Sequence, residues 1–128
     1  MKHRTLTLDP FPVSLTIILG TETEFRRHML KCYDYTPGLD LELDPYGGAY
    51  TALEHPERTY TLVIWISSLA TPTSRLGTLV HETSHAVDAT LKYINAGTDE
   101  GSGETRAYLS GWIVGRGLEL IVPEIRSK

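Results

Sequence analysis

The stretch 73–93 constrains the fold more than any other part of the chain. It contains no proline, and apolar residues recur in it at steps of three or four positions, as in a helix with one side against a core. These residues are Leu76, Leu79, Val80, Ala86, Val87, Ala89 and Leu91. Thr73 or Ser74 is suited to cap the helix after Pro72, and Gly97 lies just past its end. We therefore predict a helix of about five turns.

The middle of this helix reads His81-Glu82-Thr83-Ser84-His85, an H-E-x-x-H pattern. Residues four apart are neighbours on a helix, so His81 and His85 can bind one Zn²⁺ while Glu82 reaches a water beside it. In such a site water cleaves an amide bond, with the glutamate as general base. The alternative is an amphipathic helix whose histidines lie at a polar boundary. The unbroken helical pattern around the motif favours the metal site.

A catalytic zinc ion usually has three protein ligands and one open position, so two histidines leave the site incomplete. Glu104 is the preferred third ligand because it begins a second helical pattern after a glycine-rich turn. An antiparallel helix in this position would return Glu104 to the histidines, and Ser102 or Asp99 is suited to cap it. The apolar residues of the pattern are Ala107, Leu109, Trp112, Ile113 and Leu118.

Glu100 is the rival third ligand, since it would face the same way as Glu104 if the second helix began early. Gly101 and Gly103 disfavour that early start, because glycine costs about 1 kcal/mol in a helix interior. Glu100 and Asp99 are then charges that the helix dipole favours near the N-terminus.

Asp88 also lies on nearly the same side of the helix as His81. A continuous helix places it about 10 Å further along the axis, which is too far for a ligand of the same ion. We expect a structural role, either in a surface salt bridge or in a hydrogen bond that orients His85.

Tyr108 follows Glu104 by one helical turn. If Glu104 faces the metal, the Tyr108 phenol lies near it and can donate a hydrogen bond to an oxyanion. The alternative is a tyrosine that packs in the core. Arg106 lies on a different side of the helix, and we expect it at the surface or in an ion pair.

The combined pattern, H-E-x-x-H followed by E-x-x-A-Y, resembles the gluzincin zinc peptidases, and most closely their small single-domain members, the minigluzincins. The matching residues are His81, Glu82, His85, Glu104, Ala107 and Tyr108. The resemblance covers roughly residues 60–120, about half of the chain. It implies that Glu104 is a zinc ligand and that an edge strand above the zinc pairs with an extended peptide. The chain is also similar to HExxH proteins encoded by phages and prophages.

The residues before the motif predict a small sheet and one helix. Residues 13–19 alternate and are rich in β-branched side chains, which indicates a strand. Residues 21–24 read as a capping signal for a following helix. Residues 48–54 and 58–66 indicate two strands that form a hairpin around 55–57, a candidate rim of the site. The apolar residues of the predicted helix are Phe25, Met29, Leu30 and Tyr33.

The order of these elements predicts one α+β domain over 1–128. We expect a small twisted, mainly antiparallel sheet on one side, with the HExxH helix and the following helix packed against it. With the resemblance above, this arrangement is zincin-like.

Charge and composition exclude several classes of function. The formal net charge is -4 and no cluster of lysine and arginine occurs, which argues against a nucleic-acid partner. The apolar run 11–19 is too short to span a membrane and lacks the features of a signal peptide, so we expect no membrane association and a cytoplasmic protein. The single cysteine, Cys32, cannot form an intramolecular disulfide, and we expect it to be buried. His28 and His55 lack partners at metal spacing and are expected to be solvated.

The leading hypothesis is a zinc-dependent metalloprotease, a hydrolase acting on a peptide or protein substrate. His81, His85 and Glu104 would bind Zn²⁺, Glu82 would be the general base, and Tyr108 would stabilise the oxyanion. One alternative is a catalytically silent, zinc-stabilised binding or regulatory module, and another is a metal-free phage morphogenesis protein. Glu82 favours catalysis, because a purely structural zinc site needs no base. The sequence specifies neither the substrate nor the oligomeric state.

Overall fold

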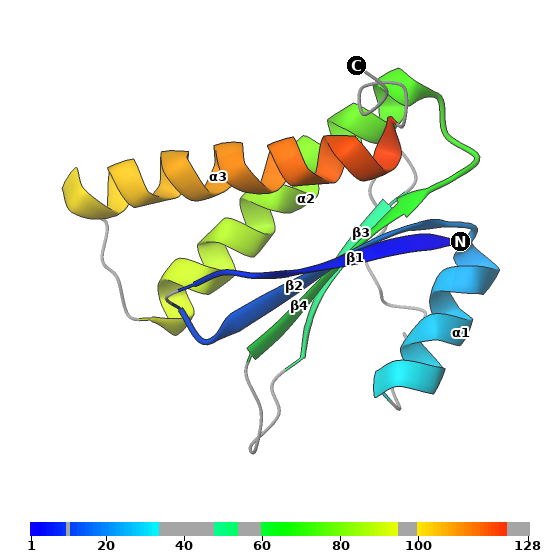
Figure 1. Ribbon diagram of the computed structural model, residues 1–128, viewed down its shortest axis with the longest axis horizontal. Helices are drawn as coiled ribbons and strands as arrows, with labels where there is room; N and C mark the ends of the chain where they lie inside the picture. Colours follow the sequence, from blue (N-terminus) through cyan, green and yellow to red (C-terminus); the bar gives the residue numbers. More distant parts are fainter. Residues whose placement is uncertain (10, 34–47, 54–59, 95–99, 123–128) are drawn as a thin grey trace.

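A computed structural model describes residues 1–9, 11–33, 48–53, 60–94 and 100–122 (Figure 1). The elements in chain order are β1 (Lys2–Thr7), β2 (Val13–Gly20), α1 (Glu22–Tyr33), β3 (Gly48–Leu53), β4 (Tyr60–Ser67), α2 (Pro72–Tyr93) and α3 (Glu100–Ile121). The predicted α+β class is confirmed. None of the helices in these ranges is long and apolar enough to cross a membrane.

The strands form one mixed sheet in the order β1-β2-β4-β3. β1 pairs antiparallel with β2, and β3 pairs antiparallel with β4, as the predicted hairpin requires. The central pair, β2 and β4, is parallel, with Ile17 opposite Ile64. Two of the three pairings between the described strands are therefore antiparallel, as predicted for a mainly antiparallel sheet, whereas the parallel pair was not predicted. α1 and β3 lie between the two central strands in the chain and form the long connection that a parallel pair needs.

Helices cover both faces of the sheet, with α2 and α3 on one side and α1 on the other (Figure 1). Alternate residues of a strand point to opposite faces, so both central strands contribute to two cores. The larger core, under α2 and α3, includes Leu15, Ile17, Leu62 and Ile64, all fully buried. Each such side chain contributes about 1.5–3 kcal/mol through burial.

The predicted capping signal of α1 is present as a reciprocal pair of hydrogen bonds. The Glu24 N–H donates to Thr21 Oγ1 at 3.2 Å, and the Thr21 N–H donates to Glu24 Oε1 at 2.9 Å. The Thr21 N–H and the N-terminal ammonium hold the pKa of Glu24 below its ordinary value. Phe25 stacks on Trp65 of β4 at 5.0 Å between ring centroids, which fixes α1 on its face of the sheet.

The expected burial of Cys32 is wrong, because its side chain is exposed. The residues of α1 that enter the core are Phe25 and Met29, and Leu30 is also exposed. A single helix on one face of a sheet buries only a narrow stripe, and the last turn of α1 contributes little to it.

The predicted helix over 73–93 is confirmed by α2, but its cap is Thr71 and not Thr73 or Ser74. Thr71 has an extended backbone, and its Oγ1 accepts a hydrogen bond from the Ser74 N–H at 3.2 Å. Pro72 therefore occupies the first turn, where its missing N–H costs nothing.

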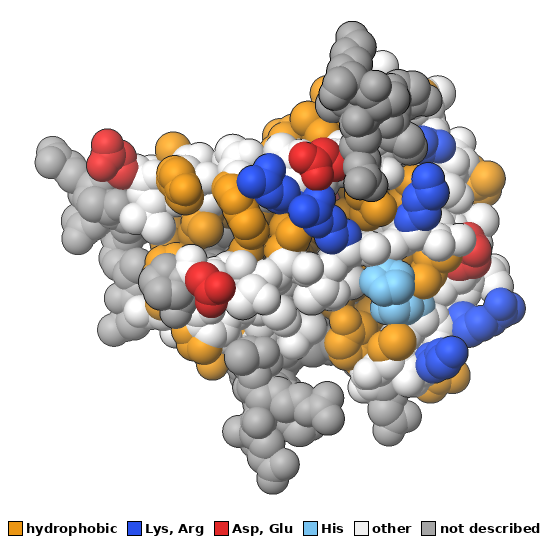
Figure 2. Space-filling view, in the orientation of Figure 1, with side chains coloured by type: hydrophobic (Ala, Val, Ile, Leu, Met, Phe, Trp, Pro, Cys, Tyr) orange, Lys and Arg blue, Asp and Glu red, His pale blue; other side chains and the backbone are white. Residues whose placement is uncertain are grey.

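Gly101 and Gly103 led us to predict a later start for the second helix, and this prediction is wrong, because α3 begins at Glu100. Once a helix is nucleated, each further residue adds a hydrogen bond, which offsets the glycine cost at its end. Figure 2 shows hydrophobic side chains along the exposed side of this helix.

Strand β1 was not predicted from the sequence. Its residues are mostly polar and exposed, and only Leu6 is buried in the core. Charged residues such as Lys2 and Arg4 are typical of an edge strand, where they discourage pairing with another chain. The alternation that identifies a half-buried strand is therefore nearly absent here.

Gly48 allows the edge strand β3 to approach α2. A Cβ atom at this position would lie 2.2 Å from Thr78 Cγ2 and 2.6 Å from the Trp65 carbonyl oxygen. The backbone oxygen cannot move away without breaking the sheet, so only glycine fits.

We predict that Gly48→Ala lowers the free energy of unfolding by about 1–3 kcal/mol through overpacking, measured by urea denaturation. Gly111→Ala is the matched control, since a Cβ there meets nothing within 4 Å. That control should leave stability equal or raise it by about 0.4–1 kcal/mol. Equal stability of the Gly48→Ala variant and the parent would contradict the close contact.

Candidate metal centre

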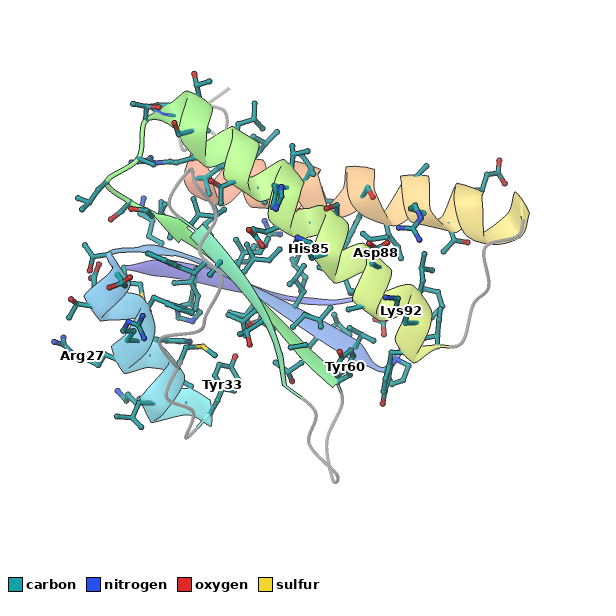
Figure 3. All side chains as sticks on the ribbon, turned by 180° about the vertical axis from the view of Figure 1, so that it is seen from behind. Arg27, Tyr33, Tyr60, His85, Asp88 and Lys92 are labelled. Carbon is teal, nitrogen blue, oxygen red and sulfur yellow. The ribbon has the colours of Figure 1, made fainter. Side chains whose placement is uncertain are left out.

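The packing of α2 decides which of its side chains are exposed. The buried residues are Thr78, Leu79, Glu82, Thr83, Ala86, Val87, Thr90 and Leu91. His81 and His85 are exposed, and on a helical projection they lie on the outer side of the helix, next to Thr78 at the edge of this buried stripe. Figure 3 shows His85, Asp88 and Lys92 on successive turns of this outer side.

The imidazole rings of His81 and His85 lie side by side, with centroids 5.0 Å apart and planes inclined at 74°. Two imidazoles bound to one tetrahedral zinc, each with a Zn–N distance of about 2.0–2.1 Å, have ring centroids about 5 Å apart. The spacing of this pair therefore fits two of the ligands of one zinc ion.

The exposed side of α2 with these histidines is close to the edge strand β3. Thr78 contacts Gly48 of β3, and His85 follows Thr78 by seven residues, almost two full turns. His85 is therefore on nearly the same side of α2 as the residue that touches β3. The strand expected to form the rim of the site lies beneath this side of the helix.

Glu82 is turned away from solvent and is only 3% exposed. On a helical projection it lies about 60° from His85, towards the sheet. Glutamate is almost never fully buried unless its carboxylate has partners. Glu82 is the one ionisable residue among the buried side chains of α2, which are otherwise apolar residues and threonines. The expectation that Glu82 faces a water beside the histidines requires the carboxylate to reach out from this buried position.

Glu104 does not join the histidine pair. Its exposed side chain lines a groove with Asp9, Phe11 and Tyr108, among others. Within the ranges that the structure describes, no group of three or more His, Cys, Asp or Glu side chains is arranged to hold a metal ion.

The register of α2 against α3 explains the separation. Asp88 pairs with Arg106, and the Arg75 Nη1 donates to the Ile121 carbonyl oxygen at 3.2 Å. Two antiparallel helices aligned by these contacts bring Glu104 opposite a point on α2 that is about 9 Å beyond His85. No motif in the sequence indicates this register.

Tyr108 and Glu104 line the same groove, as their one-turn separation predicts, but this groove does not include the histidines. Tyr108 is 74% exposed, so it is not the core tyrosine of the alternative interpretation. Its role next to an oxyanion stays a prediction.

Asp88 and Arg106 form an ion pair between α2 and α3, and both side chains are about half exposed. This matches the salt-bridge alternative for Asp88 and the expected ion pair of Arg106. A surface pair of this kind contributes about 0–1 kcal/mol.

Four residues of the sequence predictions cannot be placed in the site. His55, Gly97 and Asp99 lie outside the described residues, as does the side chain of Glu100.

His28 of α1 is partly buried and not simply solvated as expected. Its ring lies 5.2 Å from that of His3 in β1, and Cys32 Sγ is 3.8 Å from its Nδ1. Burial lowers the pKa of His28 below its ordinary value of 6.5, and the nearby His3 and Lys31 lower it further. The sequence could not reveal this pair because β1 was not predicted.

We predict that acid destabilises the fold through His28. A histidine whose pKa is lowered on folding takes up protons more readily in the unfolded chain, so stability is complete above about pH 6.5 and falls as pH drops through the folded pKa. The midpoint temperature of unfolding should therefore fall less between pH 7.5 and pH 5 in His28→Gln than in the parent. Identical pH profiles would rule out this role.

Comparison with protein-family models, curated proteins and solved structures finds no match for this chain.

Proposed function

We propose that the protein is a zinc-dependent peptidase with a zincin-like architecture, in which His81 and His85 bind the ion. The observation that carries this proposal is the pair of adjacent, exposed imidazoles at 5.0 Å, with Glu82 next to them in the helix. Exposed histidines above an edge strand leave room for an extended peptide, which can add to β3 by main-chain hydrogen bonds.

The residues present fit zinc in part. The histidine pair has the spacing of two ligands, whereas Glu104 would have to leave its groove to become the third. Bound zinc would supply a Lewis acid that polarises a carbonyl oxygen and a water. Glu82 would take a proton from the attacking water and deliver it to the leaving amine.

We predict that the purified protein binds one zinc ion per chain and that either His81→Ala or His85→Ala lowers the affinity by more than about 100-fold. Zinc at 100 times its dissociation constant should stabilise the parent by about 2.7 kcal/mol. Metal analysis and thermal unfolding measure both effects. His28→Ala is the matched control, because this histidine is on α1, across the sheet from α2. Zinc binding that survives both α2 substitutions would refute the centre.

Glu82→Gln should keep zinc and the fold, since the amide has nearly the same shape as the carboxylate. Loss of the base should lower the turnover of a peptide library by about 10²–10⁴-fold. The cleavage assay is accompanied by metal analysis, so that loss of zinc is recognised. If the variant cleaves as fast as the parent, Glu82 is not the base.

A second candidate is a zinc-stabilised binding module without catalysis. The burial of Glu82 at 3% exposure and the position of Glu104 away from the histidines favour it. For this function the parent binds stoichiometric zinc and chelation lowers its unfolding temperature, but no peptide of the library is cleaved.

A further inference from the structure

The groove that contains Glu104 is a second candidate site, separate from the histidines. It has a volume of about 650 Å³ and lies between the segment after β1 and the first turns of α3. This volume is within the range of about 300–1,000 Å³ that is usual for ligand sites. Its lining residues include Asp9, Phe11, Glu104, Tyr108 and Leu109.

The groove offers apolar and aromatic surface. Leu109, which lines it, is buried with 6% exposure, and Phe11 is partly buried against the larger core. Tyr108 also lines the groove and is 74% exposed. A tyrosine combines a large rigid ring with a low entropy cost on binding, and it is enriched at sites that dominate the energy of interfaces.

The charge of the groove is negative. Asp9 lies between β1 and β2, Glu104 is in α3, and both side chains are exposed. The described residues that line the groove include no lysine or arginine. Arg106, adjacent in the chain, is paired with Asp88 of α2. In Figure 2, acidic side chains flank hydrophobic ones at the left-hand end of α3, and basic side chains lie further to the right.

We propose that this groove binds an extended segment of a partner protein that carries a lysine or arginine next to an apolar residue. The cationic group would lie between Asp9 and Glu104 and against the face of Tyr108, which attracts cations through its π-system. The apolar neighbour would cover Leu109 and Phe11. Phosphate and nucleic acid are unsuited, because both carry the charge that the groove already has.

The probe is a synthetic heptapeptide with a central Leu-Arg-Leu, titrated into ¹⁵N-labelled protein and followed by amide chemical shifts. The matched probe replaces arginine with glutamine. We expect shifts at Asp9, Phe11 and Tyr108, and an affinity about tenfold higher for the arginine peptide, falling as salt is raised. Equal binding of the two peptides, binding by neither, or shifts confined to the His85 region would overturn the proposal.

Asp9→Asn tests the groove without touching the zinc candidates. It should weaken the arginine peptide about tenfold and leave the zinc content unchanged, whereas Glu22→Gln, the same change of charge on α1, should alter neither. Failure of zinc binding with retained peptide binding would refute the peptidase and keep the groove. Concentration-dependent dimerisation that Asp9→Asn abolishes would replace the partner segment with a second copy of this chain.

Discussion

Burial of one side of α2 against the sheet and α3 is the constraint on which the rest of the site depends. This burial fixes the rotation of the helix about its axis, and the rotation determines which residues enter the core and which face outward. His81 and His85 are four apart and therefore leave the core together. Glu82, one residue along, is carried to the buried side by the same rotation. The exposed histidine pair and the buried Glu82 carboxylate therefore both follow from the way α2 packs.

Local patterns predicted the elements whose signals are strong. Apolar periodicity identified α2, and the Thr21–Glu24 capping signal located the start of α1. Strand β1 was missed because an edge strand needs little apolar alternation. Leu6 is the only buried residue of β1, so the alternating pattern that identifies a strand is nearly absent. The cap of α2 was predicted at Thr73 or Ser74, two or three residues late, because Thr71, Thr73 and Ser74 are all good capping residues. Only the position of Pro72 in the first turn distinguishes them.

In the candidate site, too, the part set by local geometry could be predicted and the part set by tertiary packing could not. The distance between the histidine rings follows from helix geometry and was predictable, whereas the place of Glu104 depends on how α3 slides along α2. That register is set by tertiary contacts, among them Gly117 of α3, where a Cβ would lie 2.6 Å from Leu79 Cδ1. A glycine within a helix gives no indication of which leucine it will face. Sequence spacing therefore located the two imidazoles but not the distant carboxylate.

The parallel pairing of β2 with β4 also has a consequence for how the chain folds. The Ser14 and Thr61 side chains that meet across this pairing are 47 residues apart in sequence. The β1–β2 hairpin can form early from local contacts, but one long edge of β2 stays open until β4 has been synthesised and joins it. The face of β2 that carries Val13, Leu15, Ile17 and Leu19 is apolar, so during this interval the nascent hairpin exposes a surface prone to aggregation. Docking of α1, which follows β2 directly, covers Ile18 on the opposite face, so the apolar face stays open until α2 and α3 pack over it.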